Sequence, residues 1–124
     1  MGGGFETYRD LRVWEEGIRL AEVCYRVART FPREEIYGMT SQVRRSATSI
    51  PANIAEEYGR ESSGEFVRFL RVAQGSLKEL ETHVILASRV GFIEARQTTT
   101  ILNQCEVVGE MLRSLIRSVQ NKSR

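Results

Sequence analysis

The sequence contains no run of about 18 apolar residues and no basic-then-apolar leader, so it predicts neither a membrane-spanning helix nor export. We therefore expect a cytoplasmic protein. Only two cysteines are present, Cys24 and Cys105, and they lie far apart in segments with helical spacing. This usage is typical of small buried side chains in a reducing compartment rather than of a disulfide framework. At 124 residues the chain has the length of a single domain.

Residues that carry catalysis are also scarce. The one histidine, His83, follows Glu79 by one helical turn, a spacing that can bring two metal ligands together. Two ligands do not complete a site, and dimetal carboxylate bundles need Glu-x-x-His pairs, which the sequence lacks. No serine stands in a Gly-x-Ser-x-Gly turn, and no glycine-rich phosphate loop precedes a helix. We expect no catalytic residue, no metal and no cofactor, and hence no enzyme.

Lysine is scarce too, because sixteen of the eighteen basic residues are arginine. Arginine binds phosphate in a bidentate manner and stacks on bases, although a GC-rich or thermophilic source gives the same bias. Residues 113–124 carry four cations and no acid, whereas the other 112 residues hold fourteen basic and sixteen acidic residues, or −2. This basic end, formed by Arg113, Arg117, Lys122 and Arg124, favours a polyanion contact. The alternative is that these cations only complement a helix dipole.

What the sequence does contain is heptad spacing of apolar residues in four successive segments. The segments run from about Asp10 to Phe31, from about Glu35 to Tyr58, from Ser62 to Gly91, and from about Glu94 through Val119. A proline or a glycine closes each of the first three, and Ser62 followed by Glu65 has the spacing of a capping box. Short connections predict an all-α, antiparallel up-down-up-down four-helix bundle over residues 8–121. A flexible N-terminus at 1–7 precedes it, and a basic tail at 122–124 follows.

The first segment has two adjacent apolar seams. One contains Leu11, Trp14, Ile18, Ala21, Tyr25 and Ala28, and the other contains Val13, Gly17, Leu20, Cys24, Val27 and Phe31. So wide an apolar face indicates contact either with two neighbours in the same bundle or with another subunit. For the second alternative we assign the oligomer interface to Val13, Leu20, Cys24 and Val27.

The second segment contains Pro51 at its centre. Apolar residues at 43, 47, 50 and 54 lie along one side of a helix. Proline removes the amide that would bond the carbonyl of Ala47 and costs a helix interior roughly 3 kcal/mol. Hydroxyls of Ser46, Thr48 and Ser49 are placed to bond the freed carbonyls, so we predict a kinked helix rather than a loop.

Five arginines lie outside the apolar seams of the second and third segments: Arg44, Arg45, Arg60, Arg68 and Arg71. With a turn centred near residue 60, residue 44 falls roughly opposite residue 75. Arg45 and Arg71 then become neighbours across the hairpin, which predicts a shared basic patch. The alternative is that the glutamates between residues 56 and 65 neutralise these arginines in surface ion pairs.

Several motifs along the chain are not generic for a helical bundle. They are Asp-Leu-Arg-Val-Trp ending at Trp14, Phe31-Pro32 followed by Glu35 and Tyr37-Gly38, the runs 42–47 and 49–56, Gly59-Arg60, Phe66 to Leu70, and Gly-Ser-Leu-Lys-Glu-Leu-Glu over 75–81. Together, from Tyr8 to about Val119, they resemble the bacterial four-helix-bundle family of 23S rRNA intervening-sequence proteins. The chain departs from the family pattern at Glu57, where glycine is usual.

The resemblance implies a bundle without catalytic activity that assembles into a ring-like homopentamer. Members of the family are often encoded inside intervening sequences of large-subunit ribosomal RNA genes. The family is similar to the accessory proteins of diversity-generating retroelements, which are basic pentamers that bind a reverse transcriptase and nucleic acid. A pentamer would also explain the two seams of the first segment.

Two functional hypotheses follow. In the first, the protein is a non-catalytic oligomer that binds RNA or DNA phosphates without reading bases. Its contacts would be Arg44, Arg45, Arg60, Arg68, Arg71, Arg113, Arg117, Lys122 and Arg124. In the second, the protein is an interaction scaffold, such as an accessory subunit for a reverse transcriptase, and its arginines only keep the ring soluble.

Overall fold

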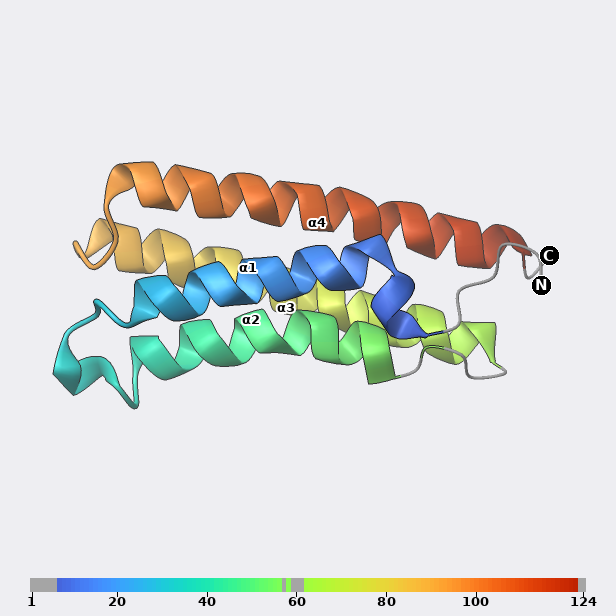
Figure 1. Ribbon diagram of the computed structural model, residues 1–124, viewed down its shortest axis with the longest axis horizontal. Coiled ribbons are helices and arrows are strands. Elements are labelled where there is room, and N and C mark those ends of the chain that lie inside the picture. The colour runs from blue at the N-terminus through green and yellow to red at the C-terminus, as the bar shows by residue number, and fades with distance from the viewer. Residues whose placement is uncertain (1–6, 57, 59–61, 123–124) are drawn as a thin grey trace.

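The computed structural model describes residues 7–56, 58 and 62–122, and these form four long helices. The helices are α1 (Arg12–Ala28), α2 (Met39–Glu56), α3 (Ser63–Arg89) and α4 (Ala95–Lys122), with 3-10 turns η1 (Tyr8–Asp10) and η2 (Arg33–Glu35). Consecutive helices run antiparallel and pack side by side, and α1 also packs against α4 (Figure 1). The predicted all-α four-helix bundle is confirmed. None of the helices in these ranges is long and apolar enough to cross a bilayer.

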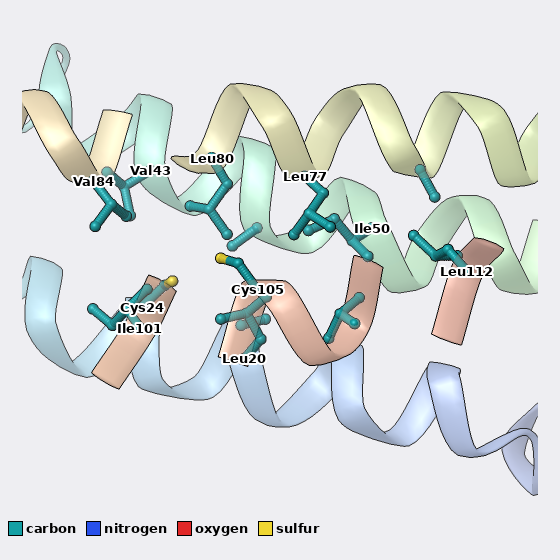
Figure 2. Packing of buried hydrophobic residues seen from close by; sticks show 14 of the residues in the cluster. Leu20, Cys24, Val43, Ile50, Leu77, Leu80, Val84, Ile101, Cys105 and Leu112 are labelled. Atoms are coloured by element: carbon teal, nitrogen blue, oxygen red, sulfur yellow. The ribbon is translucent and has the colours of Figure 1, made fainter. Parts of the chain in front are cut away.

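Heptad positions of all four helices supply the core, as the spacing predicts. The largest side chains with less than 2% exposure include Leu20, Ile50, Ile54, Leu70, Leu80, Ile101 and Leu112. Figure 2 shows labelled core residues of the four helices meeting between the ribbons. Both cysteines are free and lie in this core, as expected, and burial raises the pKa of Cys24 and of Cys105 to about 12.

The wide apolar face of α1 serves two neighbours within its own bundle, α2 and α4. The seam at positions 13, 17, 20, 24 and 27 faces the centre of the bundle, so the structure corrects our assignment of an oligomer interface to four of its members. Val13, Leu20, Cys24 and Val27 are at most 8% exposed within a single chain. An oligomer contact on α1 would need residues of the other seam, such as Tyr25, which is 40% exposed.

The first connection is longer than the heptad pattern predicts. Helix α1 ends at Ala28, because the amides of Thr30 and Phe31 bond carbonyls only three residues earlier, at 3.0 and 3.2 Å. Residues 33–35 form a 3-10 turn instead of the first turn of α2. Glu35 therefore acts outside the helix, where its Oε1 accepts a hydrogen bond of 2.9 Å from the amide of Met39 and satisfies a first-turn donor.

Helix α2 continues through Pro51, so the prediction of a helix rather than a loop is confirmed, whereas the kink remains a prediction. The expected hydrogen-bond compensation is wrong. Ser46 and Thr48 donate to the carbonyls of Gln42 and Arg44, at 2.8 and 2.9 Å, one turn before the carbonyl that the proline frees. Each hydroxyl donates to the carbonyl four residues earlier, which is the nearest acceptor on the same side of the helix.

Packing supplies an alternative stabilisation for Pro51. Its ring is buried against α1 at Gly17, where a methyl group in place of the glycine hydrogen would lie 3.5 Å from both Cβ and Cδ of the proline. The ring of Pro51 therefore packs directly on the backbone of α1 at this point, and a methyl group would make ordinary contacts there. Burial of the ring offsets part of the cost of the missing helical hydrogen bond.

Capping residues set the limits of α3. The hydroxyl of Ser62 accepts a hydrogen bond of 3.2 Å from the amide of Glu65, which confirms the predicted N-cap. At the other end Gly91 has φ 90°, a left-handed conformation that favours glycine, and the amide of Phe92 bonds the carbonyl of Ala87 at 2.8 Å. The chain then reverses into α4.

Candidate nucleic-acid interface

Arg44 and Arg45 are adjacent in sequence but serve different helix pairs. Arg45 bonds the carboxylate of Glu79 on α3 and, at 2.9 Å, the side chain of Gln42. Arg44 points the other way, towards α1, where its guanidinium lies 4.8 Å from the centre of the Tyr25 ring. Consecutive helical residues diverge by about 100°, so Arg44 faces α1 while Arg45 faces α3.

The predicted contact between Arg45 and Arg71 is wrong. Ser49 bonds Ser76 at 2.8 Å, and Arg45 bonds Glu79, so the hairpin of α2 and α3 is centred about two residues later than we assumed. Arg71 lies eight residues before Glu79, which is about 12 Å along the axis of α3. These arginines do not form one patch.

Two of the candidate arginines are neutralised by acids. Arg68 pairs with Glu65 at 3.0 Å and stacks 4.8 Å above the ring of Phe69, so the ion-pair alternative holds for it. Arg45 is paired as well, although with Glu79 rather than with an acid of the turn. Arg60 and Arg124 lie outside the described residues.

Apart from Arg44 on α2, four candidates remain, and they lie on α3 and α4 towards the end of the bundle where α1 begins and α4 ends (Figure 1). Among the described residues, no acid lies in ion-pair contact with Arg71, Arg113, Arg117 or Lys122, and all four side chains are exposed. We call these four residues the basic stripe. From Met111 to Lys122 helix α4 contains three cations and no acid.

A groove between α3 and α4 fixes the register of the stripe. Gly109 lies opposite Leu77, because a methyl group on it would come within 3.3 Å of Leu77 Cδ2. Gln74 and Arg113 line the same groove one turn nearer the termini. Arg71 precedes Gln74 by one turn and Arg117 follows Arg113 by one turn, so these three arginines continue along the groove. Lys122, nine residues after Arg113, lies at the same end of α4 but on its other side.

The charge of the residues that line the groove changes along its length. Its other end holds Glu81 and Glu106, and Lys78 there pairs with Glu81 at 3.2 Å. The exposed Glu110 is the last acid of α4 before the stripe. Beyond Glu110, α4 carries cations and no acid up to its end at Lys122.

Comparison with known proteins agrees with this fold. The family described as 23S rRNA-intervening sequence protein matches residues 9–114. The chain belongs to this family. Its fold resembles the crystal structure of a protein of unknown function from the S23 ribosomal protein family of Bacteroides thetaiotaomicron, with 28% sequence identity and a TM-score of 0.77 over 84% of this chain and 97% of that one. Among curated proteins no relative matches the sequence.

Glu79, the acid one turn before His83, already has a structural partner. His83 Nε2 lies 3.6 Å from Glu79 Oε2, but the same carboxylate bonds Arg45, whose hydrogen bond holds the pKa of Glu79 below its ordinary value. In the described ranges no three His, Cys, Asp or Glu side chains come together as a metal site requires. Glu79 is thus occupied in joining α2 to α3.

A second group of arginines, which the heptad pattern does not predict, gathers at the turn between α1 and α2. Arg29 at the end of α1 and Arg33 in η2 line one pocket together with Arg44. The available signal was local: Arg29 follows the last turn of α1, and Arg33 follows Pro32 in a turn that brings the chain back to α2. Heptad analysis emphasises buried positions and gives no weight to such a corner.

Proposed function

We propose that the protein is a non-catalytic nucleic-acid-binding protein whose basic stripe contacts phosphates of RNA or DNA without reading bases. The observation that carries this proposal is the gathering of four exposed cations, free of ion pairs among the described residues, on adjacent helices at one end of the bundle. The family, described by an rRNA intervening sequence, supports RNA as the first ligand to test.

Counterion release sets the size of the expected effect. Four phosphate contacts predict a slope of log affinity against log salt of about −2.8 for a single strand and about −3.6 for a duplex. Affinity should then fall by about 50- to 150-fold between about 50 mM and about 200 mM salt. Paired arginines such as Arg45 and Arg68 contribute less, because a phosphate would have to displace a carboxylate.

Fluorescence anisotropy with a labelled structured RNA and a labelled DNA duplex tests the proposal. Arg113→Gln/Arg117→Gln removes two contacts and should flatten the salt slope by about 1.4 to 1.8. The matched control is Arg89→Gln/Arg96→Gln, which makes the same change in net charge at exposed positions outside the stripe that have no ion pair among the described residues. An unchanged slope in the stripe variant, or an equal change in the control, would refute the role of the stripe.

Assembly into a homo-oligomer, with the ring-like pentamer as the expected form, is part of the proposal. Since the four residues first assigned to an interface are buried, contact between chains would use exposed apolar side chains. Those of α3 and α4 are Val72, Ile85, Leu86 and Val107, with Val90 just after α3. A ring would repeat the stripe and steepen the salt slope. Light scattering measures the assembly, and absence of binding at low salt would instead favour a protein scaffold, such as a reverse transcriptase partner.

A further inference from the structure

A pocket lies at the turn between α1 and α2, at the end of the bundle opposite the basic stripe (Figure 1). It has a volume of about 430 Å³. We call it the corner pocket, and its lining residues are Ala28, Arg29, Phe31, Pro32, Arg33, Ile36, Thr40 and Arg44. Three of these eight residues are arginines and none is an acid, so its chemistry is that of an anion site with apolar walls.

The three arginines of the corner pocket are not paired with nearby acids. Among the described residues no carboxylate lies in ion-pair contact with Arg29, Arg33 or Arg44. Glu35 is the half-buried acid of the same turn, and its carboxylate accepts the amide of Met39 at 2.9 Å. That carboxylate is engaged at the start of α2 and pairs with none of the three arginines, and Glu34 of the same turn is exposed and likewise unpaired with them.

Arg44 is held in place with one donor unused. Its guanidinium is stacked on Tyr25, and its Nη2 donates a long hydrogen bond of 3.4 Å to the carbonyl of Tyr25. The Nε–H group is buried without an acceptor within the described structure. Buried polar groups of native proteins almost always have a partner, so this donor calls for one, and a bound anion would supply it.

Two further groups of α2 suit a phosphate. Thr40, only 4% exposed, lies in the first turn of the helix and brings a hydroxyl to the lining of the corner pocket. The first turn of the 18-residue helix α2 also carries the positive end of the helix dipole, where the carboxylate of Glu35 already takes the amide of Met39. A tetrahedral, doubly charged group uses such a set of donors better than an isolated carboxylate does.

The apolar walls indicate what the phosphate is attached to. Ala28, Phe31, Pro32 and Ile36 form the rest of the pocket, and the next residue, Tyr37, is 94% exposed. Flat rings of bases pack on such surfaces. We infer that the corner pocket binds the phosphate monoester of a nucleotide, with the base against the apolar wall. The inference concerns a site apart from the basic stripe and does not depend on it.

The ligand has two sources, a free nucleotide and the 5′-phosphorylated end of a strand, and both are tested with the intact protein. Calorimetry compares uridine monophosphate with uridine, and a 5′-phosphorylated RNA decamer with its 5′-hydroxyl form. The measurements with RNA strands use the Arg113→Gln/Arg117→Gln variant, which weakens binding by the stripe and leaves the corner pocket unchanged. A negative result for the pocket can then be told apart from a negative result for the stripe. Tighter binding of the phosphorylated decamer identifies a strand end, and a phosphate effect confined to the mononucleotide identifies a free nucleotide.

Variants then locate the binding. Arg33 lies at an exposed position outside the long helices. Arg33→Gln should lower the affinity for uridine monophosphate by about tenfold, as expected for loss of a charged hydrogen bond. Thr40→Val keeps the shape of the side chain and should also weaken binding, whereas the control Arg96→Gln should not. Equal affinity for uridine and its monophosphate, or no effect of either pocket variant, would overturn the inference. So would a glutamate-rich peptide that binds this pocket while the nucleotide does not.

Discussion

Truncation of Leu77 tests whether this side chain packs in the core while it also lines the groove between α3 and α4. Leu77 is 2% exposed and also lines the groove. Leu77→Ala removes three carbons, worth about 2.4 kcal/mol at about 0.8 kcal/mol each, before any penalty for the void. Because the void opens into the groove, that penalty should be small, and we expect a total cost of about 2.5 to 3.5 kcal/mol within the usual range of about 2 to 5.

Urea unfolding followed by circular dichroism, at one fixed protein concentration, measures this cost. The control is Leu80→Ala, because Leu80 is 0% exposed and its truncation leaves an enclosed void that should cost about 0.5 to 1.5 kcal/mol more. A second substitution, Gly109→Ala, should recover about 1 kcal/mol in the Leu77→Ala background, where its methyl no longer meets Leu77 Cδ2 at 3.3 Å. A loss under about 0.5 kcal/mol for Leu77→Ala would show that this seam does not pack the core.

Three further predictions use other parts of the bundle. Gly75→Ala on the exposed side of α3 meets no atom within 4 Å and should stabilise the protein by about 0.8 to 1 kcal/mol in the same urea assay, and a destabilised variant would contradict the stated geometry. Burial raises the pKa of Cys24 and Cys105 to about 12, so at about pH 8 a thiol reagent should label the unfolded chain far faster than the native one, and rapid native labelling would be inconsistent with the core. The hydrogen bond from Arg45 lowers the pKa of Glu79 from 4.5, so the pair stabilises the fold above that pH and loses its effect as the pH falls through the lowered value. Arg45→Gln should raise the pKa of Glu79 in an NMR titration, and an unchanged titration would argue against the pairing.

Local chemistry made much of the fold predictable. Unbroken heptad spacing in α3 gave its buried face, and Ser62 and Gly91 gave its ends, because a cap and a left-handed glycine act within one turn of the chain. Helix α1 shows the limit of this reasoning. Its two apolar seams are equally good by sequence, and only packing against α2 and α4 makes the seam of Leu20 the deeper one.

The site depended on geometry that sequence spacing does not contain. The partner of Arg45 follows from the register of the α2–α3 hairpin, and an error of about two residues in its centre moved the position opposite Arg45 by about four, away from Glu79 and within one turn of Arg71. The corner pocket needs a non-helical turn at 33–35 to bring Arg33 near Arg44, and the acids there looked like the first turn of a helix. Charge composition, by contrast, pointed correctly to an acid-free segment at the end of α4.

The most direct test of the account is the salt dependence of RNA binding when the whole stripe is neutralised. The variant replaces Arg71, Arg113, Arg117 and Lys122 with glutamine, after light scattering has shown the same assembly as the unaltered protein. Phosphate binding by all four cations predicts a slope of about −2.8 or steeper for the unaltered protein on a single strand, and the variant should lose about 2.8 of it. A variant that keeps both the affinity and the slope would contradict the assignment of phosphate binding to α3 and α4.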